Sequence, residues 1–200
     1  MSMTPKTLLH AALFTVKDPR AGARAVLEMG LSLQTGLTAL LLMAVCSTML
    51  SSVIFLYSPM RDDPELAKVF GNPVLLAAVQ VAVLALMALV IHVVGRRFDG
   101  KGDLAGAVVL TAWLEFVLVL LQVMQLVSLF LPPVIAEALG LLGFVLFIWL
   151  LVEFIKELHG FASAIKVLFM ILATFLATLF AISLLFAVVL MALGGDVTNV

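Results

Sequence analysis

The chain has 200 residues and a formal net charge of −1; 64% of its residues are hydrophobic and 12% are charged. Soluble domains carry charge on about a quarter of their residues, so this chain has too little charge to cover a surface that faces water. Its mean hydropathy of +1.29 indicates lipid as the main solvent. The balanced charge gives no basic excess for nucleic acid, and a single cysteine, Cys46, excludes an internal disulfide.

Residues 1–30 are predicted to form an amphipathic segment at the membrane surface. Asp18 and Pro19 are typical of a helix start. The basic residues that follow suit a helix lying among anionic lipid headgroups. Packing of this segment against the membrane helices is the alternative. The basic residues assigned to lipid headgroups, here and after the second span, are Lys17, Arg20, Arg24, Arg96 and Arg97.

Five apolar runs follow, and each is long enough to cross a bilayer, for which about 20 apolar residues suffice. The alternating pattern of a β-barrel is absent, and helices are the other way to satisfy backbone groups in lipid. The sequence therefore predicts an all-α polytopic membrane helical bundle over residues 31–194, with a short external tail at 195–200. The predicted spans are 31–57, 73–94, 104–131, 133–154 and 165–193.

The loops predict the orientation, because Lys and Arg favour the cytoplasmic side. Nine basic residues lie in the N-terminal segment and in the loops after the second and fourth spans, whereas the opposite side holds only Arg61 and Lys68. We therefore expect a cytoplasmic N-terminus and, after five spans, a periplasmic C-terminus.

Turn signals separate the spans. Asp63 and Pro64 are expected to start a helix of about two turns that ends at Gly71. The fourth helix is expected to continue about one turn past its span and to end at Gly160, with Ser163 opening the fifth helix.

The third span carries a polar stripe. At 100° per residue, Thr111, Glu115, Gln122 and Gln125 fall within a sector of about 80°. Glu115 lies about 16 Å into the membrane from the start of the span, which is near the midplane. Gln80, nearer the outer end of the second span, is expected to form a hydrogen bond with one of the two glutamines.

Two interpretations of this stripe remain open. It can be a proton relay or a path for a small solute, since ionisable groups in membranes are commonly functional. It can instead join helices, where each hydrogen bond contributes about 0.6 kcal/mol. The sequence lacks the second charge, broken helix and inverted repeat typical of transporters, which favours the structural interpretation.

Small residues recur at the spacing that lets helices approach closely. Such faces serve internal packing or the helix of a partner protein, and internal packing is the more common use. The candidate residues are Ala173, Ala177 and Ala181 in the fifth span and Gly140 and Gly143 in the fourth.

Catalytic and metal-binding signatures are absent from the sequence. There is no GxSxG, HExxH, Walker loop or GxGxxG motif, so we expect neither enzymatic activity nor a cofactor. His10, His92 and His159 all lie towards the inner side, but none has a metal-binding spacing. We interpret them as solvated or interfacial residues.

The order of several short segments resembles a bacterial member of the Yip1 domain family over nearly the whole chain. These segments are DPRAGARAVLEMG, FDGKGDLAGA, AWLEFVLVLLQ and LHGFASAIKV. The resemblance implies a multi-pass membrane protein without known catalysis, here in the bacterial inner membrane. Eukaryotic members act in vesicle traffic with Rab-type GTPases, but their Asp-Leu-Tyr-Gly-Pro motif is absent here, so that role is not carried over.

These observations favour a non-enzymatic scaffold or accessory subunit, acting for another membrane protein or for membrane organisation. The expected partners are the lipid bilayer and either another membrane protein or a second copy of the chain. The alternative is a small transporter or channel with a polar path along Glu115, Gln122 and Gln125.

Overall fold

The computed structural model describes residues 5–192, and the described chain is all-α, without strands. The predicted tail at 195–200 lies outside the described residues. The elements are α1 (Pro5–Lys17), α2 (Pro19–Glu28), α3 (Leu33–Leu56), η1 (Pro59–Asp62), α4 (Pro64–Phe70), α5 (Pro73–Arg97), α6 (Leu104–Ser128), α7 (Pro133–His159) and α8 (Ala164–Ala192).

Five of these helices, α3, α5, α6, α7 and α8, are long and apolar enough to cross a membrane. This confirms the predicted fold class, an all-α membrane protein with five spans. The chain divides into two compact units, the first ending at Ala162 and the second beginning at Ser163. Within the described residues, the second unit consists of Ser163 and α8.

Short polar residues fix where the helices begin. Asp18 Oδ1 accepts a hydrogen bond of 3.0 Å from the Ala21 N–H, with Pro19 in the first helical position. Asp63 caps α4 in the same way, and Pro64 follows it. These side chains satisfy backbone donors that the first turn of a helix leaves without partners, and both predicted starts are confirmed.

The junction after α7 is also as predicted. α7 continues beyond the predicted span 133–154 and ends at His159, because Gly160 takes a left-handed conformation with φ of 73°. Glycine adopts this conformation without the steric penalty of a side chain. At the start of α8, the Ser163 hydroxyl accepts a hydrogen bond from the Lys166 N–H.

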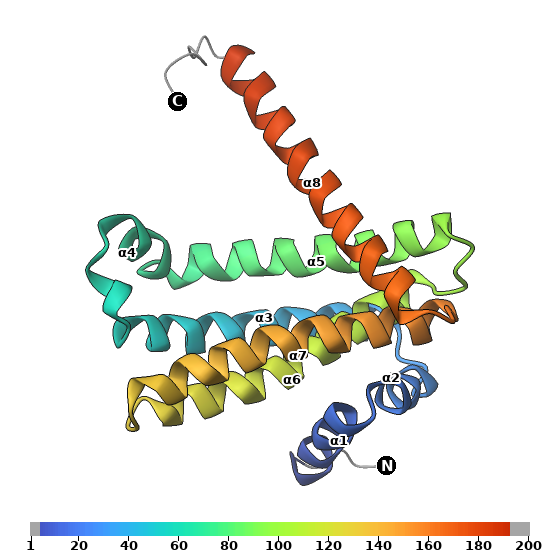
Figure 1. Cartoon of the computed structure of the whole chain (residues 1–200), viewed down its shortest axis with the longest axis horizontal. Coiled ribbons are helices and arrows are strands. Elements are labelled where there is room, and N and C mark those ends of the chain that lie inside the picture. The colour runs from blue at the N-terminus through green and yellow to red at the C-terminus, as the bar shows by residue number, and fades with distance from the viewer. Residues whose placement is uncertain (1–4, 193–200) are drawn as a thin grey trace. The chain divides into compact units, whose positions relative to one another are not determined.

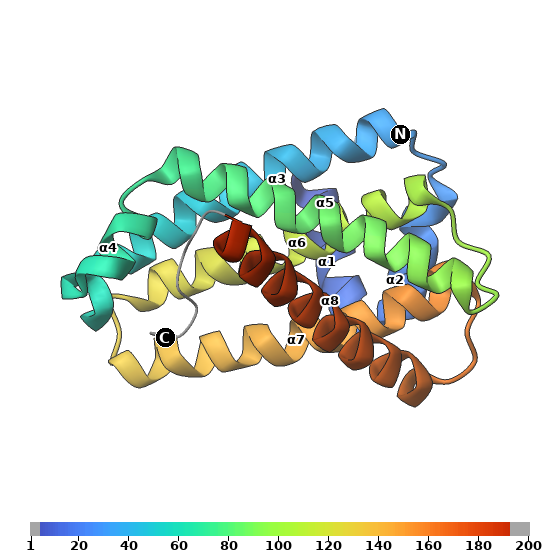
Figure 2. The ribbon, with the colours of Figure 1, turned by 90° about the horizontal axis from the view of Figure 1, so that it is seen from above.

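In the first unit α3, α5, α6 and α7 run side by side, as both views show (Figures 1 and 2). α6 is the most buried of the four, and it packs against each of the other three. Small residues from three helices, Ala44, Ala88 and Ala112, meet in one core cluster with Leu40 and Leu84. This close contact of α3, α5 and α6 positions the polar residues of the third predicted span.

The α1–α2 segment packs against the membrane helices (Figure 1), which was the alternative interpretation of residues 1–30. The Trp113 Nε1–H donates a hydrogen bond of 3.1 Å to the hydroxyl of Thr15, which is buried. α1 and α2 cross tightly at this point, since a Cβ on Gly22 would lie 2.5 Å from Thr15 Oγ1. The N-terminal segment is thus attached to α6 through a side chain of α1.

His159, expected to be solvated or interfacial, is 2% exposed, so that interpretation is wrong. Its Nδ1 accepts a hydrogen bond of 3.2 Å from the Gly102 N–H, and its Nε2 lies 3.1 Å from the Ile91 carbonyl oxygen. Because Nδ1 accepts, Nε2 carries the proton and donates. The Lys101 N–H donates in turn to the His159 carbonyl oxygen. The loop between α5 and α6 is thereby bound to the end of α7.

Three glycines leave the space that the imidazole fills. A Cβ on Gly95, Gly100 or Gly102 would run into the ring of His159. Two of these glycines belong to the FDGKGDLAGA segment and His159 to the LHGFASAIKV segment. The two segments therefore meet at one side chain, a contact that separate motifs could not reveal.

We predict that Gly102→Ala destabilises the fold, because its Cβ would lie 2.5 Å from Leu158 Cγ and 2.9 Å from His159 Cε1 of the imidazole. Overpacking of this kind costs about 1–3 kcal/mol. Thermal unfolding of the detergent-solubilised protein measures the effect. Gly140→Ala is the matched control, since its Cβ would lie at an ordinary contact distance of 3.5 Å from its nearest neighbour, Gln125 Nε2. Equal melting temperatures for the two variants would contradict the tight packing of this loop.

Candidate functional site

Glu115 is the buried carboxyl group at the centre of the site. It is 6% exposed on α6, and its Oε1 accepts a hydrogen bond of 3.0 Å from the Gln80 Nε2–H of α5. Gln80 was expected to pair with Gln122 or Gln125, and that pairing is wrong. The expectation assumed that α5 and α6 end at the same depth, and the offset between two helices cannot be counted from their sequences.

Two serines of α3 continue this contact. Ser47 is a second polar neighbour of the Glu115 side chain. The Gln122 Nε2–H donates to Ser47 Oγ at 3.1 Å and reaches Ser51 Oγ at 3.5 Å. Two sets of hydrogen bonds thus join α6 to α5 and to α3. We call this group of residues the polar seam, and it consists of Gln80, Glu115, Ser47, Gln122 and Ser51.

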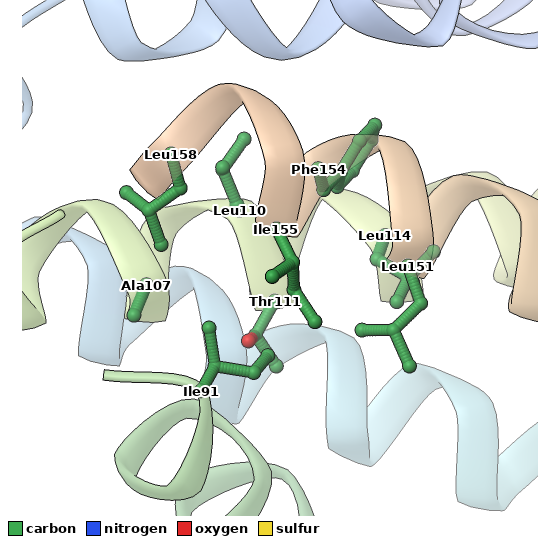
Figure 3. A pocket seen from close by; sticks show the side chains of 9 residues that line it. All are labelled: Ile91, Ala107, Leu110, Thr111, Leu114, Leu151, Phe154, Ile155 and Leu158. Carbon is green, nitrogen blue, oxygen red and sulfur yellow. The ribbon is translucent and has the colours of Figure 1, made fainter. Parts of the chain in front are cut away.

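Thr111 of the predicted stripe does not join the polar seam. Its side chain is buried, and its hydroxyl has no hydrogen-bond partner among the described residues. It lines a small cavity between α5, α6 and α7, where the other side chains are apolar (Figure 3). The volume of the cavity is about 10 Å³, which leaves room for about one water molecule. The residues around it are Ile91, Ala107, Leu110, Thr111, Leu114, Leu151, Phe154, Ile155 and Leu158.

The small residues predicted for helix packing fall in both units. On α7, Gly140 faces the Gln125 amide, and a Cβ on Gly143 would lie 3.0 Å from Leu121 Cδ2. Both glycines thus lie against α6, and Gln125 points to α7 rather than to the polar seam. The three alanines lie on α8, where their side chains are exposed: Ala173, Ala177 and Ala181.

Within the described residues, the polar seam gives the Glu115 carboxyl hydrogen-bonding neighbours but no positively charged partner. These neighbours are an amide and a hydroxyl. A serine hydroxyl donates to a carboxylate or accepts from a carboxylic acid, while the Gln80 N–H donates to either form. The site can therefore hold a proton on Glu115, and it joins α5, α6 and α3 in doing so.

A second group of polar residues lies where α2 meets the end of α7. The Arg24 Nε–H donates to Glu157 Oε1 at 2.7 Å, and Arg20 Nε lies 3.5 Å from Glu157 Oε2 and 3.8 Å from Glu153 Oε2. Lys156 Nζ lies 2.8 Å from Glu153 Oε2. The hydrogen bond from Arg24 to Glu157 raises the pKa of the Arg24 guanidinium above its ordinary value.

Two of the predicted headgroup contacts therefore also have protein partners. Arg96 has one as well, since its Nη1–H donates to the Gly100 carbonyl oxygen at 3.4 Å. Lys17 and Arg97 are exposed. Sequence analysis missed Glu153 and Glu157, although their four-residue spacing matches that of the arginines.

We predict that Gln80 and Glu115 are energetically coupled. In a double-mutant cycle of Gln80→Leu and Glu115→Leu, the coupling energy should lie between about 0.6 and 1.7 kcal/mol, the range for hydrogen bonds between membrane helices. Reversible unfolding in bicelles measures it. Gln125→Leu with Glu115→Leu is the control pair and should be additive, because Gln125 faces α7. Additivity in the first pair would show that this bond contributes nothing to stability.

Comparison with known proteins agrees with this architecture. The model of the Yip1 domain family matches residues 14–198, from the end of α1 past the last described residue. No curated protein and no solved structure matches the chain. Because the match covers far more than half of the chain, the protein belongs to the Yip1 domain family.

Proposed function

We propose that this multi-pass membrane protein is a non-enzymatic scaffold or accessory subunit, which binds another membrane protein or organises lipid. Its family is generally non-catalytic, and its five apolar helices place it in contact with the bilayer. The proposal includes the bacterial inner membrane as location, a cytoplasmic N-terminus and a periplasmic C-terminus. The asymmetry of basic residues between the loops supports that orientation.

The observation that carries this proposal is the closure of the polar seam. Glu115 and Gln122, which a solute path would expose, instead form hydrogen bonds with Gln80 of α5 and Ser47 of α3. Within the described residues, Gln122 Oε1 is buried and has no hydrogen-bond partner. The nearby cavity is apolar apart from Thr111 and holds about 10 Å³. Hydrogen bonds of this kind favour a role in fixing the helix arrangement.

α8 supports one of the two proposed roles, the binding of another membrane protein. Ala173, Ala177 and Ala181 recur every fourth residue, so they share one face of this helix. Small residues at this spacing let a second backbone approach closely. We assign this face to another membrane protein or to a second copy of the chain.

We predict that the full-length protein, tagged and extracted in a gentle detergent, carries one stoichiometric membrane partner or a second copy of itself. Mass spectrometry of the purified complex identifies which. Ala177→Leu should reduce recovery of that partner, because the added bulk separates the two backbones. Leu179→Phe is the control, since it adds bulk to the opposite face of α8. Purification of a monomer without any partner would contradict the scaffold role.

The alternative is a small transporter or channel, and the buried position of Glu115 favours it. The two functions differ in one assay, the flux of protons into liposomes that contain the purified protein. We predict no flux above that of empty liposomes, for the wild type and for Glu115→Gln alike. A flux in the wild type that Glu115→Gln abolishes, with the fold intact, would establish transport and overturn the scaffold proposal.

A further inference from the structure

The ion-pair cluster between α2 and α7 has a feature that internal pairing does not explain. The cluster consists of Arg20, Arg24, Glu153, Lys156 and Glu157. The side chains of Glu153 and Glu157 are only 15% and 13% exposed, whereas those of Arg20 and Arg24 are 48% and 59% exposed. The carboxylates therefore lie beneath, and the guanidinium groups face outward.

The charges of the cluster do not cancel. Three cations share two carboxylates, and Lys156, which is nearly buried, takes part of the charge of Glu153. Lys17 lies exposed just before α2, while Asp18 and Glu28 bring two negative charges close to Arg24. The attraction for a phosphate therefore comes from the exposed guanidinium groups and not from a net positive charge of the surrounding surface. The cluster occupies the last two turns of α7, the level at which the end of a membrane helix meets lipid headgroups.

Both arginines also have N–H donors besides the Nε–H groups that face the carboxylates. All three contacts with the carboxylates run through Nε, and a guanidinium group has five N–H donors in a planar fork. The fork matches the oxygens of a phosphate in a bidentate arrangement. Each arginine can thus bind a carboxylate with one edge and a phosphate with the rest.

α1, which packs against α2, supplies exposed apolar side chains. Leu9, Leu13 and Phe14 are each about half exposed. Exposed apolar side chains on α1, together with exposed cations on the helix that packs against it, suit an amphiphile whose phosphate and acyl chains enter different environments. A soluble phosphate or an acidic peptide would use the cations and leave the apolar residues uncovered.

We propose that Arg20 and Arg24 bind the phosphate of an anionic phospholipid, with its acyl chains beside α1 and the ends of the membrane helices. The carboxylates of Glu153 and Glu157 lie beneath the arginines and compete with the phosphate for them. This inference rests on the proposed role in organising lipid. Its test uses the purified chain alone, so the lipid site and the protein partner can fail separately.

The test measures binding of fluorescent phosphatidylglycerol to the full chain in a neutral detergent. The double variant Arg20→Gln with Arg24→Gln should lower the affinity about thirtyfold, or about fivefold for each lost charge. Arg61→Gln with Lys68→Gln is the matched control. It removes two exposed cations that also pair with acidic residues, at the other end of the spans, and it should leave the affinity unchanged. Equal affinity in all three proteins would overturn the proposal.

A second double variant tests the proposal even if the first double variant fails to fold. Glu153→Gln with Glu157→Gln keeps both arginines and removes the competing carboxylates, so the affinity for phosphatidylglycerol should rise several-fold. If the arginines serve only to attach α2 to α7, this variant will bind the lipid no better than the wild type, which would overturn the proposal.

Two further ligands identify the source of the phosphate. Phosphatidylcholine, which has no net charge, should compete weakly, and inorganic phosphate at millimolar concentration should not displace phosphatidylglycerol. Displacement by inorganic phosphate alone would assign the site to a soluble anion and contradict the lipid assignment.

Discussion

The hydrogen bond between Gln80 and Glu115 is the contact on which the arrangement of the membrane helices depends. A carboxyl group at this depth finds no water in lipid, and leaving it without a partner costs several kcal/mol. Glu115 therefore has to face other helices, which fixes the rotation of α6 about its own axis. With α6 turned this way, Gln122 reaches the serines of α3, and Gln125 lies against α7.

The end of α7 is the second organising element, because three different contacts converge there. His159 binds the loop between α5 and α6, Glu153 and Glu157 hold α2, and Gly160 ends the helix. The contacts of His159 and of the two glutamates join segments far apart in the sequence, and both use polar or charged side chains. The polar seam thus aligns the helices within the membrane, and the end of α7 connects the segments outside it.

Local signals predicted much of this fold. The five spans follow from the length of the apolar runs, and Asp18, Asp63 and Gly160 mark helix ends because capping depends only on neighbouring residues. The pairing of Gln80 and the burial of His159 could not be predicted, since they depend on helix offset and on a distant loop. The ion pairs between α2 and α7 could have been predicted from the sequence, because the two arginines and the two glutamates each have a four-residue spacing.

We expect the polar seam to be a closed contact between helices that does not line a water path. Accessibility of single cysteines tests it directly. In a Cys46→Ser background, cysteines at Ser47, Gln80 and Gln122 are exposed to a membrane-impermeant thiol reagent in vesicles opened to both sides. We predict labelling as slow as that of a cysteine at Leu84, which is buried in the apolar core. Labelling of all three positions as fast as at the loop residue Lys101 would contradict it.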